Sequence, residues 1–131
     1  MKKVYIAGAM SDPDCIEFLM NLNRGIRASK DLLLMGYAPY SPFIDFQFFL
    51  ALIGDEYITG EMIKNYSLAW LEVSDAILVL PNHHTSKGTQ AEITRAKELG
   101  IPIYYSLEEL KRAETINECK EIINKIEGGI K

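Results

Sequence analysis

The feature of this sequence that most constrains its fold is the uninterrupted apolar run AILVL at residues 76–80. A strand that is hydrophobic on both faces is typical of a parallel sheet covered by helices on both sides. Three further short strand signals occur at residues 4–7, 37–40 and 101–105. The sequence therefore predicts a parallel sheet, provided that helices connect these strands.

Helical segments are expected between the strands. The first starts at the Ser-Asp-Pro sequence of residues 11–13 and ends at Gly36, and the third ends at Gly100. The expected helices are 11–35, 61–73, 89–99 and a tail from 115, and 106–109 has capping-box spacing. This alternation predicts an α/β fold, a three-layer Rossmann/flavodoxin-like domain with a parallel sheet of four to five strands flanked by helices. Trp70 is expected in its core.

Composition narrows the functional classes. The 131 residues, 48% hydrophobic and 24% charged, predict one globular domain over 1–131. The net charge of −4 argues against a polymeric nucleic acid as partner. No apolar stretch reaches the roughly 20 residues of a spanning helix, which predicts a soluble cytoplasmic protein without a membrane partner. Cys15 and Cys119 are far apart, so we expect reduced, buried thiols and no metal site.

A binding site is expected at the carboxyl ends of the strands, where open parallel sheets bind ligands. The segments 8–11, 41–43 and 81–92 lie there, and helix N-termini after the first and third favour an anion. Ser11, Ser86, Gly88 and Thr89 allow close approach to a phosphate or carboxylate. The glycine signatures of dinucleotide-binding and P-loop folds are absent.

Glu92 is the candidate for chemistry. We expect it in the first turn of the third helix, where the helix dipole would help to keep it ionised beside the pocket. An ionised, partly desolvated carboxylate near a sugar can act as a nucleophile. The spacing of Thr89 and Glu92 equally fits a capping box, so a purely structural role stays open.

Three segments resemble the nucleoside 2-deoxyribosyltransferase superfamily: KVYIAGAM at 3–10, WLEVSD at 70–75 and SKGTQAE at 86–92. The resemblance runs to about residue 105 and is nearest to small deoxyribosyltransferase-like proteins and 2'-deoxynucleoside 5'-phosphate N-hydrolases. It implies cleavage of the base–sugar bond of a deoxynucleoside or its monophosphate. Glu92 is the implied nucleophile, which forms a covalent sugar ester, and Tyr5 is implied to orient it.

The resemblance implies further site residues. The 5' end of the substrate would be held by Ser86 and Gly88 together with the turn Gly8, Ala9, Met10 and Ser11. Asp75 matches a family aspartate, although a structural role before the strand is equally open.

Ser67 stands where relatives carry an aspartate that protonates the base or binds the sugar. Serine is not a comparable acid, and Asp45, Asp55 or Glu61 can substitute.

The apolar segment 43–58 reads as a short helix or loop over the site. Phe43 suits a wall beside a flat base, and the segment also suits self-association into a homodimer or higher homo-oligomer. The pair His83 and His84 reads as an exposed loop, with base stacking as an alternative.

The preferred function is an N-glycosidase for a nucleoside or nucleoside 5'-monophosphate, with hydrolysis favoured over base transfer and no cofactor. One alternative is a nucleotide-binding sensor without turnover, suggested by Ser67. Another is a phosphoribohydrolase of the Lonely Guy type, because residues 88–92 fit its G-T-x-x-E ending.

Overall fold

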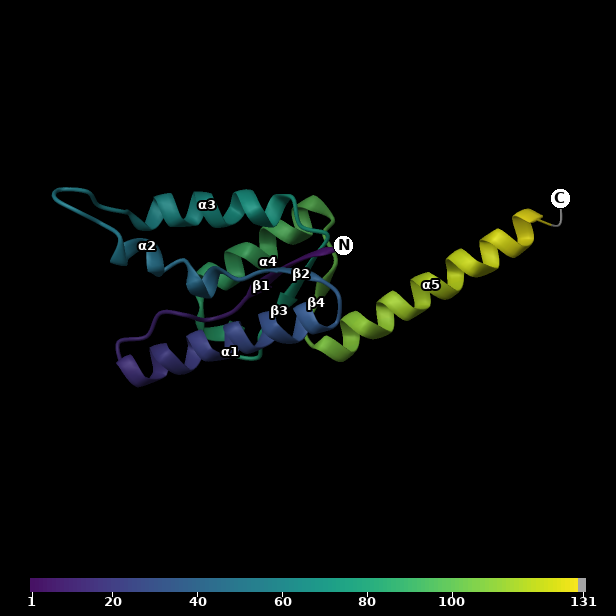
Figure 1. Cartoon of the computed structure of the whole chain (residues 1–131), viewed down its shortest axis with the longest axis horizontal. Coiled ribbons are helices and arrows are strands. Elements are labelled where there is room, and N and C mark those ends of the chain that lie inside the picture. The colour runs from purple at the N-terminus through teal and green to yellow at the C-terminus, as the bar shows by residue number, and fades with distance from the viewer. Residues whose placement is uncertain (130–131) are drawn as a thin grey trace.

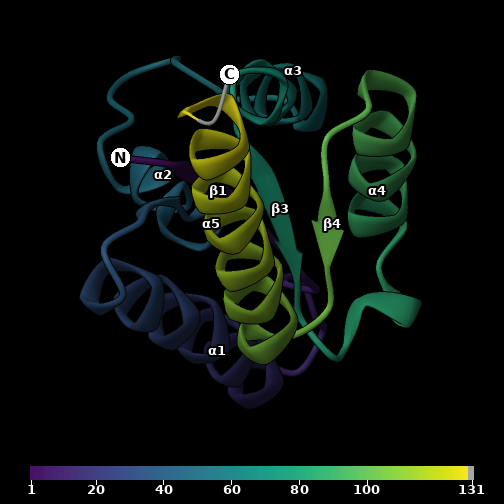
Figure 2. The same cartoon turned by 90° about the vertical axis from the view of Figure 1, so that its right-hand side faces the viewer.

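The computed structural model describes residues 1–129 and contains a four-stranded parallel sheet with helices on both faces (Figures 1 and 2). The strand order is β2-β1-β3-β4. The strands are β1 (Lys3–Ala7), β2 (Ala38–Tyr40), β3 (Ala76–Val79) and β4 (Ile103–Tyr104). The predicted α/β class with a parallel sheet is confirmed. Within these residues, no helix has both the length and the apolar character needed to span a membrane.

Five α-helices and two 3-10 turns connect and follow the strands. They are α1 (Cys15–Leu34), η1 (Pro42–Ile44), α2 (Gln47–Leu50), α3 (Gly60–Glu72), η2 (His83–Thr85), α4 (Lys87–Leu99) and α5 (Leu107–Gly129). Helix α1 begins slightly later than predicted, because the side chain of Asp14 caps it by accepting from the N–H of Ile16 at 2.8 Å. After α1, Gly36 adopts a φ of 92°, a conformation that favours glycine.

The core has two layers, one on each face of the sheet. Every residue of β3 is buried, as its apolar run predicts. On one face Val4, Ile6 and Leu78 pack with Leu22 and Leu32 of α1. On the other face Tyr5, Ile77 and Val79 pack with Leu71 of α3 and Ile93 of α4. Each fully buried aliphatic side chain contributes roughly 1.5–3 kcal/mol, so these two layers fix the positions of α1, α3 and α4 on the sheet.

Helix α5 differs from the prediction of a tail helix beginning at Thr115. It is continuous from Leu107, because Ser106 accepts a hydrogen bond from the N–H of Glu109 at 3.1 Å, as the capping-box spacing predicts. Thr115 lies inside the helix and donates to the carbonyl of Lys111. The helix projects away from the sheet (Figure 1), and residues 115–129 are exposed.

Three core predictions are wrong. Cys15 and Cys119 are exposed, because Cys15 begins α1 and Cys119 lies on the projecting part of α5. Trp70 is 46% exposed, because it lies toward the rim of the α3 layer, where its ring stacks on Tyr40 with centroids 5.6 Å apart. The segment 43–58 does form short helical turns, and there Phe43 is buried while Phe48 and Phe49 are about half exposed.

Candidate functional site

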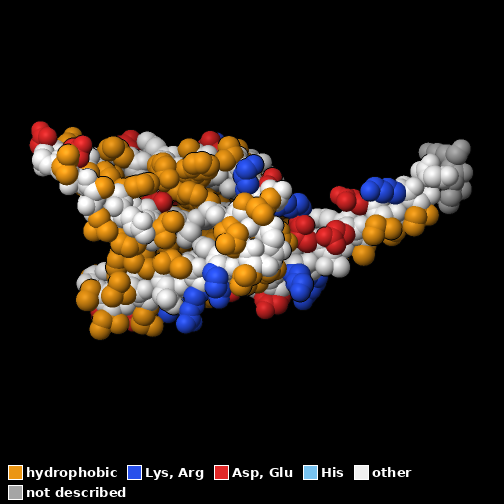
Figure 3. Space-filling view, viewed as in Figure 1, with side chains coloured by type: hydrophobic (Ala, Val, Ile, Leu, Met, Phe, Trp, Pro, Cys, Tyr) orange, Lys and Arg blue, Asp and Glu red, His pale blue; other side chains and the backbone are white. Residues whose placement is uncertain are grey.

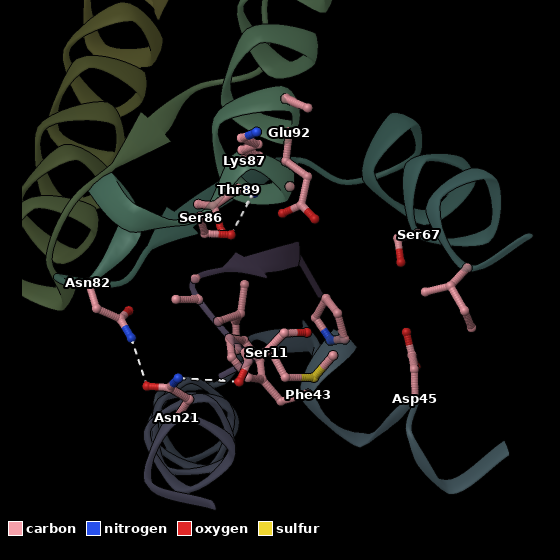
Figure 4. Close-up of a pocket in the computed structure, with 18 of the residues that line it drawn as sticks. Ser11, Asn21, Phe43, Asp45, Ser67, Asn82, Ser86, Lys87, Thr89 and Glu92 are labelled. Atoms are coloured by element: carbon pink, nitrogen blue, oxygen red, sulfur yellow. Dashed lines mark hydrogen bonds between the residues drawn. The ribbon is translucent and has the colours of Figure 1, made fainter. Parts of the chain in front are cut away.

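A cavity of about 720 Å³ lies at the carboxyl ends of β1 and β3. The chain leaves β1 toward β2 and leaves β3 toward β4, so the two connections diverge and open a crevice between them. Residues 8–12 after β1, the turn at 42–45, α1, α3 and the start of α4 supply its walls (Figure 4). Its volume is in the range of cavities that hold small ligands.

The start of α4 lies at the cavity and is fixed by Ser86. The Ser86 hydroxyl accepts hydrogen bonds from the N–H of Thr89 at 3.2 Å and from the Thr89 hydroxyl at 2.9 Å. The helix therefore begins at Lys87, two residues before the prediction, and the proposed capping box from Thr89 to Glu92 does not form. Glu92 lies in the second helical turn instead of the first. The first N–H groups of the helix still face the cavity as anion donors.

Glu92 is a partly buried carboxyl in the cavity wall. Burial raises its pKa to about 7, and the neighbouring Tyr5 hydroxyl opposes that rise. The predicted place in the first turn of the helix is wrong, and at its actual place burial favours the protonated form of Glu92. At neutral pH the group is divided between its acid and carboxylate forms, which is typical of functional carboxyls.

Tyr5 lies under the cavity on β1 and is fully buried. Its hydroxyl is beside the carboxyl of Glu92 and the hydroxyl of Ser67. No well-formed hydrogen bond ties it to any group within residues 1–129. Burial, followed by the charge of Glu92, raises the pKa of Tyr5, so it stays protonated and can donate. The structure therefore brings the predicted pair Tyr5 and Glu92 together.

Ser67 and Asp45 form the wall opposite Glu92. Their exposed fractions are 6% and 5%, and in Figure 4 the hydroxyl and the carboxyl are directed toward one another. The Asp45 carboxyl accepts a hydrogen bond from the Tyr40 hydroxyl at 3.0 Å. Burial raises the pKa of Asp45 and this hydrogen bond opposes the rise. Of the three carboxylates considered as substitutes for the missing aspartate, Asp45 lines the cavity, whereas Asp55 and Glu61 are not among its lining residues.

The predicted binding residues converge on the same cavity. Its lining includes Gly8, Ala9, Met10, Ser11, Ser67, Ser86, Gly88 and Phe43. At Gly8 a Cβ atom would lie 2.8 Å from the side chain of Leu80, so only glycine lets the end of β1 approach β3 so closely. Phe43 contributes to the wall, but it is 2% exposed and most of its ring packs in the core against Gly25.

Two sets of candidate residues lie elsewhere. The Asp75 carboxyl accepts from the N–H of Lys3 at 2.7 Å, at the amino ends of the strands. Its predicted catalytic role is wrong in this geometry, because the cavity lies at the opposite edge of the sheet. His83 and His84 do not line the cavity, and His83 bonds the carbonyl of Leu80. Among residues 1–129 no cluster of three His, Cys, Asp or Glu side chains has metal-binding geometry.

The sequence analysis did not predict Asn21, which links α1 by hydrogen bonds to the loops that follow β1 and β3. The buried Asn21 donates to the carbonyl of Met10 and accepts from Asn82 at 3.0 Å and from Arg24 at 2.9 Å (Figure 4). Arg24, Lys64 and Lys87 bring positive charge to the cavity lining. The one signal in the sequence was a polar residue, Asn21, among the apolar positions of α1, which indicates a buried side chain with hydrogen-bond partners. Its pairing with Asn82, distant in sequence, leaves no local pattern.

Comparisons with known proteins agree with this architecture. A family described as "Domain of unknown function (DUF4406)" matches residues 2–105. No curated protein matches the chain. A structure of 2-deoxyribosyltransferase from Bacillus psychrosaccharolyticus is 20% identical, covers 77% of this chain and 69% of that one, and has a TM-score of 0.53.

A conserved protein from Enterococcus faecalis V583 is 22% identical, covers 90% and 76%, and has a TM-score of 0.50. These likenesses show that the chain shares its fold with a 2-deoxyribosyltransferase and with this conserved protein. The family match spans most of the chain, including both strands that frame the cavity. The chain therefore belongs to the DUF4406 family.

Proposed function

We propose that this protein cleaves the base–sugar bond of a nucleoside 5'-monophosphate or nucleoside, with Glu92 as nucleophile and hydrolysis favoured over base transfer. One observation carries the proposal: Glu92 is a partly buried carboxyl with a pKa of about 7, in a ligand-sized cavity above the Tyr5 hydroxyl. The fold is shared with a 2-deoxyribosyltransferase, which supports the same class of chemistry.

The polar groups of the cavity suggest how a nucleotide would lie in it. The start of α4, with Ser86 and Gly88, and the guanidinium of Arg24 would hold the phosphate, because N–H donors and positive charge meet there. Phe43 and Asp45 line the region left for the base. The sugar would then lie between these two regions, beside Glu92.

The reaction would proceed in two steps. A carboxylate oxygen of Glu92 bonds to the anomeric carbon while the base departs with the electrons of the C–N bond. The Tyr5 hydroxyl, which lies beside Glu92 and can donate to it, would orient the attacking carboxylate. Water then attacks the sugar ester, releases the sugar and restores Glu92. No step requires a cofactor or metal.

The decisive experiment incubates the protein with ribo- and deoxyribonucleosides and their 5'-monophosphates and follows free base by chromatography. Glu92→Gln, which keeps the shape of the side chain, is the matched variant. Base release by the wild type and not by the variant supports the proposal and identifies the substrate. Release of base by Glu92→Gln at the wild-type rate would rule out the nucleophile.

Ser67 favours a second candidate, a nucleotide-binding sensor without turnover. It would be supported if thermal shifts showed nucleotide binding while no substrate released base. A preference for ribonucleoside over deoxyribonucleoside monophosphates would instead favour the phosphoribohydrolase of the Lonely Guy type.

Assembly into a homodimer or higher homo-oligomer, a cytoplasmic location and one domain over 1–131 stay predictions. Exposed hydrophobic side chains gather over α1, α2 and α3 (Figure 3), including Leu19, Phe48, Phe49 and Met62. A mass of one chain, 14.8 kDa, by light scattering would contradict self-association.

A further inference from the structure

We propose that Asp45 is the proton donor to the departing base. The acid then comes from the turn after β2, since position 67 of α3 carries a serine. The inference rests on the proposed function and adds the second half of its chemistry. It assigns a role to a buried carboxyl that nucleophilic attack by Glu92 leaves unexplained.

Asp45 is positioned at the cavity. It follows the 3-10 turn η1, where its N–H donates to the carbonyl of Pro42 at 3.0 Å, and this turn directs the side chain into the cavity. Glu92 enters from α4 on the opposite wall (Figure 4). Two carboxyl groups on opposite sides of one cavity are the arrangement that glycosidases use for a nucleophile and an acid.

The surroundings of Asp45 disfavour a charged carboxylate. The side chain is 5% exposed, and within residues 1–129 no Lys or Arg forms an ion pair with it. One carboxyl oxygen, Oδ2, accepts from the Tyr40 hydroxyl. A buried carboxyl without a cation is favoured in its neutral form, which can donate a proton. The raised pKa of Asp45 agrees with this direction.

With Asp45 as the acid, protons and electrons balance in both steps of the reaction. As the C–N bond breaks, its electron pair goes to the base, and the proton of Asp45 moves to a nitrogen or carbonyl oxygen of that base. Glu92 forms the bond to the anomeric carbon. In the second step the Asp45 carboxylate takes a proton from the attacking water, and Glu92 departs as carboxylate. The products are free base and sugar, and both carboxyls return to their starting states.

The active form needs a proton on Asp45 and none on Glu92. A bound base would present an acceptor atom to Asp45, which would stabilise the protonated carboxyl. The Tyr5 hydroxyl beside Glu92 can donate to it and so stabilise the carboxylate. Substrate binding thus favours the required distribution of the proton. Ser67, whose hydroxyl is a far weaker acid, can contribute only a hydrogen bond.

The test compares two leaving groups in Asp45→Asn. One substrate is the best ordinary nucleotide of the panel. The other is N7-methyl-2'-deoxyguanosine 5'-monophosphate, whose base already carries a positive charge and departs neutral without a proton. We expect kcat/KM to fall roughly 10²–10⁴-fold on the ordinary substrate, the usual contribution of a general acid, and less than about tenfold on the methylated one.

Two further variants separate chemistry from structure. Tyr40→Phe removes the hydrogen bond from the Tyr40 hydroxyl to Asp45 but keeps the carboxyl. We expect equal, small losses of kcat/KM on both substrates. The double variant Asp45→Asn with Ser67→Asp places an acid on α3, at the position toward which the side chain of residue 45 is directed (Figure 4). We expect it to recover part of the lost activity on the ordinary substrate.

Equal losses on both substrates in Asp45→Asn, or unchanged activity, would overturn the role of Asp45 while the glycosidase proposal stands. Absence of base release by the wild type from either substrate would remove both proposals together.

Discussion

The two edges of the same sheet each carry a carboxylate, and the comparison shows what makes one of them a candidate for catalysis. At the amino edge, Asp75 is exposed and accepts from the N–H of Lys3, while its own N–H donates to the Lys3 carbonyl. At the carboxyl edge, Glu92 is partly buried and faces a cavity. Asp75 makes two hydrogen bonds with the backbone of Lys3, which join the start of β3 to β1. The Glu92 carboxyl is largely removed from water, which disfavours its charged form, and it lies where a ligand in the cavity can reach it.

The largest effect expected from this comparison is on activity. Glu92→Gln should lower base release at least about 10³-fold, because no nucleophile replaces the carboxylate. Asp75→Asn should leave kcat/KM within a few fold. Chromatographic assay of both variants at equal protein concentration measures the difference. A larger loss in Asp75→Asn than in Glu92→Gln would reverse the assignment of the two edges.

The second effect is on stability and depends on pH. The pKa of Glu92 is raised from 4.5 to about 7 in the folded protein, so folding favours its protonated form. This favourable contribution is complete below pH 4.5 and is lost as the pH rises through 7. Glu92→Gln should therefore match the wild type in free energy of unfolding near pH 4.5 and exceed it by about 2–3 kcal/mol at pH 8.5.

Urea denaturation at both pH values measures this difference, and a ¹³C NMR titration of the Glu92 carboxyl tests its cause. If the free energies of unfolding of Glu92→Gln and the wild type differed by the same amount at pH 4.5 and 8.5, the predicted pH dependence would be wrong.

The third effect concerns the two glycines of the cavity edge. Gly8→Ala should cost about 1–3 kcal/mol, because its Cβ would lie 2.8 Å from Leu80. Gly88→Ala is the matched control, since its Cβ would meet only the Ser86 hydroxyl at 3.9 Å. Thermal unfolding of both variants is the measurement. Equal melting temperatures would show that β1 and β3 can separate at this edge without cost.

The smallest effect is expected at the amino edge. Asp75→Asn keeps an oxygen that can accept from Lys3 but loses the charge, so the free energy of unfolding should fall by about 1 kcal/mol or less. Lys97→Ala, on the exposed face of α4, serves as a surface control for the same urea measurement. A loss above 3 kcal/mol would show that this contact stabilises far more than one strand junction.

The sheet was predictable because residues 76–80 are apolar on both faces and glycine ends the flanking helices. The start of α4 was harder to predict, because Ser86 and Thr89 are both common N-cap residues. In the folded chain Ser86 is the residue that caps the helix. Asp75 directly precedes β3, whereas Glu92 follows β3 in α4. The two carboxylates therefore lie at opposite ends of the same strand.

The site was predictable in part. Ser86, Gly88 and Glu92 line the same cavity because they lie at the start of the helix that follows β3 or within it. Tyr5, in the middle of β1, lies beside Glu92. The contact of Asn21 with Asn82 joins α1 to the loop after β3, and no local pattern encodes such a pair.

The projecting part of α5 has a hydrodynamic consequence. A 23-residue helix is about 35 Å long, whereas a compact chain of 131 residues has a radius of gyration of about 14 Å. With residues 115–129 exposed, the particle is elongated and its friction in solution exceeds that of a sphere of equal mass. A single copy will elute from a sizing column ahead of its 14.8 kDa and resemble a small oligomer. Sedimentation and scattering, which separate mass from shape, are therefore the measurements that define its assembly.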